Sequence, residues 1–174
     1  MFKLDELLTK KRLISAGASV VDLGAAPGGW SARAKEIVGQ RGSVLAVDLL
    51  DIAPIEDVRI LKGDITSTEV ITQVVEIVGK NNVDLVLSDM APNITGIRDA
   101  DEARFVELIE AVMAVLAYVL KPGGAVILKM FQFPGTDEQI KVLRKMFAEI
   151  SRIKPEASRK QSKEFYVVAR GYKL

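Results

Sequence analysis

Residues 20–30 have the sequence VVDLGAAPGGW. The stretch begins with apolar, β-branched residues typical of a buried strand, continues through a turn rich in glycine, and then enters a segment with helical spacing. In open α/β sheets, ligands bind beyond the carboxyl end of such a strand, at the turn that leads into the helix. The stretch therefore predicts a strand of an α/β sheet and one wall of a ligand site.

Strand-like and helix-like segments alternate along the whole chain. Apolar runs such as VDLVL and AVILK fit strands that helices cover on both faces. The alternation predicts an α/β fold with a doubly wound, mostly parallel sheet. The predicted strands span residues 19–23, 43–47, 58–61, 83–87 and 125–128, and the predicted helices span residues 30–38, 67–78, 100–120 and 137–148.

The ends of these segments carry signals of their own. Residues 66–69, TSTE, are typical of a capping box at the start of a helix, and residues 121–124, KPGG, indicate a helix stop and a turn. Beyond Pro155 the chain is polar and basic, and residues 164–169 then have the pattern of a last strand. We expect this strand to pair antiparallel at the edge of the sheet.

The composition limits both the number of domains and the available chemistry. With 174 residues, of which 49% are hydrophobic, the chain is long enough for one well-buried domain and short for two. We expect one domain over residues 1–174, with an N-terminal helix over residues 1–15 that bears Lys3 and the core over residues 16–174. Cysteine and histidine are absent, so disulfides and the common zinc ligands are excluded, and we expect no metal site. Catalysis must then use carboxylates, lysines, hydroxyls or a cofactor.

The first residues lack the apolar core of a secretory signal. Residues 1–13, MFKLDELLTKKRL, mix charge into every turn, and no stretch approaches the ~20 apolar residues of a membrane span. We expect a cytoplasmic, monomeric protein that does not contact membranes. The formal net charge is +1, from 24 basic and 23 acidic residues, so any surface that binds nucleic acid must be local.

Polar residues follow several of the predicted strands. Asp48, Asp64, Asp89 and Lys129 each stand at or just after the end of a strand. Because the carboxyl ends of parallel strands meet at one edge of the sheet, these side chains are expected at one rim, where ligands bind. The alternative for each aspartate alone is a helix cap or a turn former.

The glycine-rich turn distinguishes between kinds of nucleotide. A dinucleotide fingerprint needs a second glycine where this chain has Ala26, and the Gly-Lys-Ser/Thr of a P-loop is absent. Gly24, Gly28 and Gly29 still allow the backbone to approach a ligand closely, and Asp48 can accept hydrogen bonds from ribose hydroxyls. The turn favours an adenosine without pyrophosphate, with a plain strand-to-helix turn as the alternative.

The motifs VVDLGAAPGGW, AVDLL, LKGDI, LSDMAPN, ILKMFQ and SKEFYVVA resemble, in this order, those of the FtsJ/RrmJ family. Members of that family are S-adenosyl-L-methionine-dependent RNA ribose 2′-O-methyltransferases, and the bacterial ones modify large-subunit ribosomal RNA. The resemblance implies a Rossmann-like methyltransferase fold, S-adenosyl-L-methionine as cofactor, and a uridine of ribosomal RNA in the large subunit as substrate. It also implies a cofactor site formed by Gly24, Gly28, Gly29, Trp30, Asp48, Asp64 and Asp89, and a catalytic tetrad of Lys3, Asp89, Lys129 and Glu164.

The residue types of the tetrad suit methyl transfer to a ribose hydroxyl. The 2′-hydroxyl is a weak nucleophile, so it must be aligned with the sulfonium and must lose a proton. Lys129 is the candidate base, and a lysine acts as a base only where its surroundings favour the neutral amine. Alternatively, the carboxylates hold the ammonium groups while Lys3 or Lys129 orients the hydroxyl.

The sequence does not decide which substrate the protein uses or which residues contact RNA. Transfer RNA, a small molecule, or binding of RNA without turnover are the alternatives to ribosomal RNA methylation. Members of the family usually carry a longer basic segment before FKLDE, so we expect either a shortened chain or a reduced RNA grip. The remaining candidates for RNA contact, with solvated faces as the alternative, are Lys10, Lys11, Arg12, Arg152, Lys154, Arg159, Lys160 and Lys163.

Overall fold

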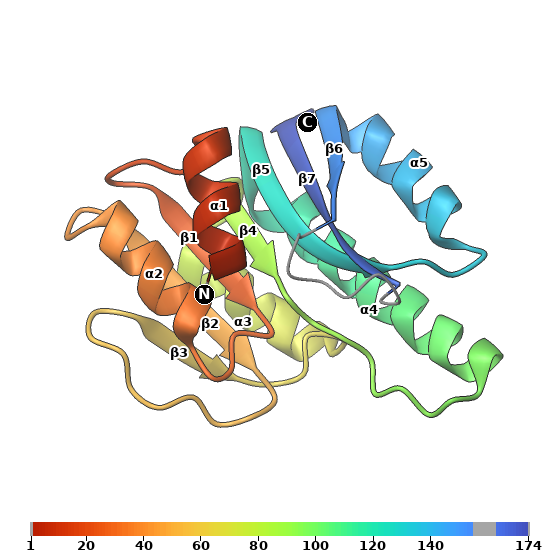
Figure 1. Ribbon diagram of the computed structural model, residues 1–174. Helices are drawn as coiled ribbons and strands as arrows, with labels where there is room; N and C mark the ends of the chain where they lie inside the picture. Colours follow the sequence, from red (N-terminus) through yellow and green to blue (C-terminus); the bar gives the residue numbers. More distant parts are fainter. Residues whose placement is uncertain (1, 155–162, 174) are drawn as a thin grey trace.

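The computed structural model describes residues 2–154 and 163–173, which form a sheet with helices on both faces (Figure 1). The helices are α1 (Phe2–Lys11), α2 (Gly29–Val38), α3 (Thr68–Val78), α4 (Arg98–Val119) and α5 (Thr136–Met146). The strands are β1 (Ser19–Leu23), β2 (Ser43–Asp48), β3 (Arg59–Lys62), β4 (Val83–Ser88), β5 (Leu120–Phe131), β6 (Phe147–Ile153) and β7 (Glu164–Tyr172).

The strands lie in the order β3-β2-β1-β4-β5-β7-β6. The first five strands in this order are parallel to one another, whereas β7 is antiparallel to both β5 and β6. The direction in which the strands are added reverses between β1 and β4, the position where open α/β sheets bind ligands. The predicted α/β class with a doubly wound, mostly parallel sheet is confirmed.

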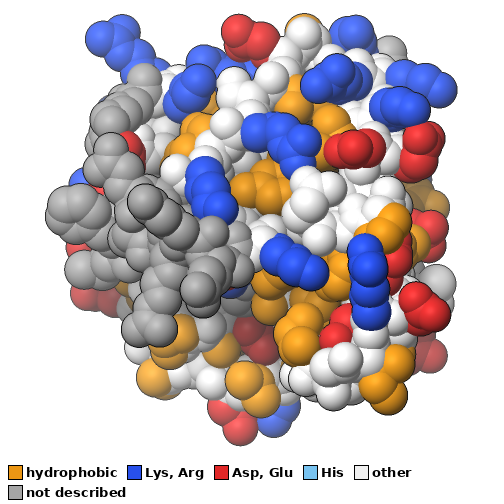
Figure 2. All heavy atoms as spheres, turned by 45° about the vertical axis from the view of Figure 1, so that its right-hand side comes forward, with side chains coloured by type: hydrophobic (Ala, Val, Ile, Leu, Met, Phe, Trp, Pro, Cys, Tyr) orange, Lys and Arg blue, Asp and Glu red, His pale blue; other side chains and the backbone are white. Residues whose placement is uncertain are grey.

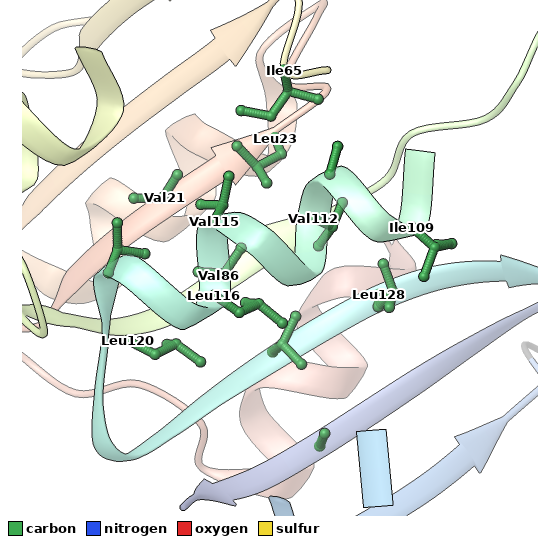
Figure 3. Packing of buried hydrophobic residues seen from close by; sticks show 14 of the residues in the cluster. Val21, Leu23, Ile65, Val86, Ile109, Val112, Val115, Leu116, Leu120 and Leu128 are labelled. Carbon is green, nitrogen blue, oxygen red and sulfur yellow. The ribbon is translucent and has the colours of Figure 1, made fainter. Parts of the chain in front are cut away.

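Two apolar clusters fix the helices to the two faces. On one face, Ile109, Val112 and Leu116 of α4 pack against Val86 and Leu128 of the strands (Figure 3). Helices α3 and α5 belong to the same cluster, and α1 and α2 form a second cluster on the opposite face. Each fully buried aliphatic side chain contributes about 1.5–3 kcal/mol relative to an exposed one. The strand ends are therefore held in fixed positions relative to one another.

The antiparallel part of the sheet differs from the prediction in one strand. Residues 147–153 form β6, so β6 is the edge strand and β7 lies between β5 and β6. The antiparallel pairing of β7 is confirmed, but its predicted place at the edge is wrong. Since β6 has one neighbour, most of its side chains are exposed or half-buried, and it lacks the apolar run from which the other strands were predicted.

Two predicted boundaries also differ. Thr66 is not the cap of α3, because its hydroxyl donates to Oδ1 of Asp64 (2.7 Å), and α3 begins at Thr68 after Ser67. The predicted turn over residues 121–124 is part of β5, whose pairing with β4 is irregular at this point. At the start of α3, the Asp64 carboxylate competes with the helix backbone for the Thr66 hydroxyl. At residues 121–124, an irregularity in the pairing of β5 accommodates the two glycines.

Charge is mixed over the surface. Figure 2 brings the side of the molecule that carries α5 forward and shows Lys and Arg side chains spread over this face, with acidic and hydrophobic side chains among them. This mixing agrees with the net charge of +1. Within residues 2–154 and 163–173, no helix combines the length and the apolar character needed to cross a bilayer.

Candidate functional site

A pocket of about 280 Å³ opens beyond the carboxyl ends of β1, β2, β3 and β4, beside the point where the strand order reverses. Asp48, Asp64 and Asp89, which the sequence placed at strand ends, all line it. The apolar part of its wall includes Met90 and also Leu108 of α4. The pocket therefore combines three carboxylates with an apolar surface.

The glycine-rich turn contributes to this pocket mainly through Gly24. Gly24 lines the pocket at φ +72°, and a Cβ at this position would collide with Cγ of Met90. Gly28 (φ +119°) instead lies against Ile55, where a Cβ would be 2.7 Å from Cδ1. Gly29 is the first residue of α2 and has open space around its Cβ position. Of the three glycines, Gly24 is the one that touches the pocket.

Two of the carboxylates are held by backbone and still have acceptor positions for a ligand. Asp48 accepts hydrogen bonds from the N–H of Ala26 (Oδ2, 2.8 Å) and of Leu50 (Oδ1, 2.9 Å), so it ties the turn to the end of β2. Asp64 accepts from the N–H and the hydroxyl of Thr66, both at Oδ1. Because a carboxylate offers about four lone-pair positions, each can accept further bonds from ribose hydroxyls.

A further carboxylate, which the sequence prediction missed, lies below the turn. Asp22 of β1 is fully buried, and burial raises its pKa from 3.8 to about 7; the hydrogen bond from the Ser31 hydroxyl (2.6 Å) opposes the rise, and Asp89 and Asp48 add to it. Among the described residues, Oδ1 of Asp22 has no hydrogen-bond partner. The only signal in the sequence was one acidic residue inside an apolar strand. Asp22 therefore adds a titratable group close to the other carboxylates.

A second group of polar side chains borders the pocket at Asp89. The Nζ atom of Lys129 lies 3.6 Å from Oδ1 of Asp89 and 3.3 Å from Oε2 of Glu164. Lys129 is opposite Tyr166 in the pairing of β5 with β7, and side chains two residues apart in a strand share a face. Lys129, Glu164 and Tyr166 therefore project from one face of the sheet, toward the end of β4. Three of the four predicted tetrad members are brought together.

Tyr166 and Trp30 surround this cluster on the α2 side. The Tyr166 hydroxyl donates to Oδ1 of Asp89 (2.9 Å), and burial, together with the nearby charge of Asp89, raises the pKa of Tyr166 far above its usual range. The hydroxyl is therefore a permanent donor. Trp30 packs against the Tyr166 ring (5.9 Å between centroids) and is not part of the pocket wall.

The other predicted residues are only partly within the described structure. Lys3 lies in α1, on the sheet face that carries Tyr166, but its side chain is outside the described part of the chain. Arg159 and Lys160 lie outside the described residues altogether. Lys154 and Lys163, by contrast, are described and lie close to Glu164.

The donor and acceptor set of the pocket fits S-adenosyl-L-methionine. Asp48 and Asp64 can accept from ribose hydroxyls, the apolar wall can cover a base, and the carboxylates favour a ligand with positive charge. The Gly24 backbone packs so closely against Met90 that a side chain at this position would not fit. Lys129 and Glu164 lie at the border of this pocket, where a second substrate would meet the ligand.

Comparisons with known proteins find relatives over nearly the whole chain. The family model of the FtsJ-like methyltransferases matches residues 1–172. The chain is 43% identical over 172 residues to Ribosomal RNA large subunit methyltransferase E of Pseudomonas paraeruginosa, covering 99% of this chain and 83% of that protein. It is 44% identical over 172 residues to the protein of the same name from Stutzerimonas stutzeri, covering 99% of this chain and 84% of the relative.

Solved structures share the fold at low sequence identity. A ribosomal RNA methyltransferase of Plasmodium falciparum has a TM-score of 0.83 at 24% identity, with 98% of this chain and 95% of that chain covered. An arsenic(III) S-adenosylmethionine methyltransferase of Chlamydomonas reinhardtii has a TM-score of 0.56 at 17% identity, with 91% and 64% covered. The arrangement of strands and helices is thus one that methyltransferases use.

Proposed function

The chain belongs to the FtsJ-like methyltransferase family, and we propose that it transfers a methyl group from S-adenosyl-L-methionine to the 2′-hydroxyl of a uridine in large-subunit ribosomal RNA. The names of the relatives at 43% and 44% identity support ribosomal RNA as the substrate. Such a substrate implies action in the cytoplasm. The observation that carries the proposal is the position of Lys129 between Asp89 and Glu164, directly beside the pocket.

Gly24, Asp48, Asp64 and Asp89 would hold the cofactor, because they line the pocket and offer backbone space and acceptors. When bound, S-adenosyl-L-methionine supplies an electrophilic methyl group on a sulfonium. Asp48 and Asp64 would bind ribose hydroxyls through the lone pairs that the backbone does not use. Asp89 would lie between the cofactor and the RNA, because it lines the pocket and also contacts Lys129.

Lys129 would act on the hydroxyl of the RNA. In its neutral form, Nζ would accept the proton of the 2′-hydroxyl as the oxygen takes up the methyl group and the carbon–sulfur bond breaks, so the proton lost by the ribose would end on the amine. The resulting ammonium lies 3.6 Å from Asp89 and 3.3 Å from Glu164, and both carboxylates stabilise its charge. The Tyr166 hydroxyl donates to Asp89 and so orients its carboxylate. Lys3, at the start of α1, would complete the tetrad.

The decisive experiment offers labelled S-adenosyl-L-methionine and three RNAs to the protein in parallel: large ribosomal subunits, naked ribosomal RNA and transfer RNA. We expect label on the 2′-oxygen of one uridine of the ribosomal RNA, mapped by nuclease digestion and mass spectrometry. A Lys129→Ala variant is the control for contaminating activity. Label on transfer RNA instead would change the substrate, and label on none of the three would refute the proposed enzyme.

A further inference from the structure

A basic hollow lies on the other side of Glu164 from the cofactor pocket. Its volume is about 330 Å³, and Gln132, Arg152, Lys154, Lys163 and Glu164 line it. The carboxyl ends of β5 and β6 and the amino end of β7 meet here, because β7 runs antiparallel to both neighbours. The hollow therefore opens at the same edge of the sheet as the pocket between β1 and β4.

The hollow adjoins the reacting centre through one side chain. Glu164 lines the hollow, and its Oε2 atom is 3.3 Å from Nζ of Lys129. Arg152 is opposite Val167, so Arg152 and Phe165 project from the other face of the sheet than Glu164 and Lys129, and a group in the hollow reaches Lys129 around the amino end of β7. In RNA, the carbon next to the one that bears the 2′-hydroxyl carries a phosphodiester, so a ribose at Lys129 brings a phosphate to this neighbourhood.

The charge of the hollow suits such a phosphate. Among residues 2–154 and 163–173, neither Lys154 nor Lys163 forms an ion pair, so both ammonium groups are available to a ligand. The charge of Glu164, the acidic group on the wall, already faces Lys129. The cofactor pocket, with Asp48, Asp64 and Asp89, has the opposite sign and would repel a phosphate.

Arg152 is fixed in place in this hollow. Its Nη2 donates to Oε1 of Gln132 (2.8 Å), its Nη1 lies 3.7 Å from Oδ1 of Asp137, and its guanidinium carbon is 4.3 Å from the centre of the Phe165 ring. A guanidinium held by three neighbours loses little conformational freedom when it binds an anion. Asp137 offsets part of its charge, so the two lysines provide most of the attraction.

We propose that this hollow binds the phosphodiester next to the methylated ribose, with Lys154 and Lys163 contacting its oxygens and Arg152 forming the preorganised wall. The inference rests on the proposed RNA ribose methylation and adds a subsite for the neighbouring phosphate. The RNA strand then crosses the edge of the sheet from Lys129 toward β6 and keeps away from the acidic pocket. Binding of RNA at this point is electrostatic and independent of base sequence.

The test compares two double variants with the unaltered protein. Lys154→Gln with Lys163→Gln removes the two free charges of the hollow, and Lys80→Gln with Lys173→Gln removes two exposed lysines at the opposite edge of the sheet. RNA affinity is measured against salt concentration, and calorimetry with S-adenosyl-L-methionine checks that each variant is folded. We expect the hollow variant to bind RNA several-fold more weakly at about 0.1 M salt, with a salt slope reduced by about 1 to 2. The opposite-edge variant should bind RNA and methylate it as the unaltered protein does.

A second arm identifies the phosphate. The RNA fragment that the protein methylates is synthesised with one neutral methylphosphonate linkage, placed on the 5′ or the 3′ side of the target ribose. One of the two should weaken binding to the unaltered protein and have no further effect on the hollow variant, because the shared contact is already lost. If each linkage weakens both proteins equally, the subsite is refuted while methylation stands. If no RNA is methylated at all, the proposed function fails and the subsite fails with it.

Discussion

The two sides of Asp89 differ in strand direction and in charge. On one side, the parallel strands β2, β3 and β4 end in a pocket with the carboxylates of Asp48, Asp64 and Asp89. On the other side, β5, β7 and β6 include the antiparallel pairs and end in a hollow with Lys154 and Lys163. Both open at the same edge of one sheet, and Asp89 and Lys129, 3.6 Å apart, form the border between them.

This difference matches the charges of the two proposed substrates. A sulfonium cofactor is a cation and is favoured by carboxylates, whereas RNA is a polyanion and is favoured by ammonium groups. Each proposed ligand would be attracted to one side and repelled from the other, so the methyl group and the hydroxyl would meet at the border. The net charge of the chain is only +1, because the acidic and basic side chains are separated locally, at the pocket and at the hollow.

The largest effect should come from the border itself. Lys129→Ala removes the group proposed to accept the hydroxyl proton, and we expect single-turnover methylation to slow by about 10²–10⁴-fold, the range for a positioned acid or base. Cofactor affinity should barely change, because Lys129 does not line the pocket. Rapid-quench methylation of the substrate RNA, with enzyme saturated in cofactor, isolates this step from product release.

Lys129→Arg is the matched variant for the same position. A guanidinium keeps its proton at any accessible pH and has a planar fork, so we expect this variant to be nearly as slow as the alanine variant. If either variant methylated RNA at the unaltered rate, Lys129 would have no part in proton transfer. That result would not bear on whether the protein is a methyltransferase.

Asp89 should affect both sides, because it lines the pocket and contacts Lys129 and Tyr166. For Asp89→Ala we expect turnover to fall by about 10²-fold and cofactor affinity to fall by about 5- to 10-fold, through lost charge and lost hydrogen bonds. Calorimetry and single-turnover rates separate the two effects. A loss confined to turnover would remove Asp89 from the cofactor side of the border.

Asp48 should affect the acidic side alone. Asp48→Ala removes the proposed acceptors for ribose hydroxyls, and we expect cofactor binding to weaken by about 1–3 kcal/mol, with RNA affinity unchanged. The variant also loses the bonds to Ala26 and Leu50, so its thermal stability is measured alongside. Asp48→Asn keeps one of the two oxygen acceptors and should fall between the two proteins. The glycine-rich turn disfavours NAD, so tight binding of NAD would contradict the assignment of this pocket to S-adenosyl-L-methionine.

The parallel side was also the part of the fold that the sequence predicted best. β1, β2 and β4 are buried along most of their length, and turns separate their apolar runs, so these strands could be recognised to within a residue. β6 was missed because an edge strand with one neighbour needs no such run. Its existence follows from pairing with β7, a contact between distant segments that no local pattern contains.

The same contrast holds for the site. Asp48, Asp64 and Asp89 were predicted because carboxyl ends of parallel strands meet at one rim. Tyr166 was missed because its place beside Lys129 depends on the register of β5 against β7, which local sequence does not specify. Asp22 was missed because its burial follows from helix packing on β1. One acidic residue in a short apolar run does not predict which face of the sheet its side chain projects from.

Asp22 allows the most specific test of the acidic side. Its pKa is raised to about 7 in the folded protein by burial, against 3.8 for the ordinary carboxyl, so the folded state keeps a proton that the unfolded state has released. The contribution to the free energy of unfolding is thus fully present below about pH 4 and is lost as the pH rises toward 7, by at most about 1.4 kcal/mol per pH unit.

In Asp22→Asn this contribution is absent, and the amide oxygen can still accept from Ser31. We expect the variant to gain stability relative to the unaltered protein between pH 4 and pH 7, and the difference to become constant above about pH 8, in urea unfolding followed by circular dichroism. A bound sulfonium nearby favours the ionised carboxylate, so cofactor binding near pH 7 should release a proton from the unaltered protein and none from the variant. Calorimetry in buffers of different ionisation enthalpy counts that proton. A stability difference that is flat with pH, together with equal proton release, would mean that Asp22 is ionised throughout and that its burial does not control its charge.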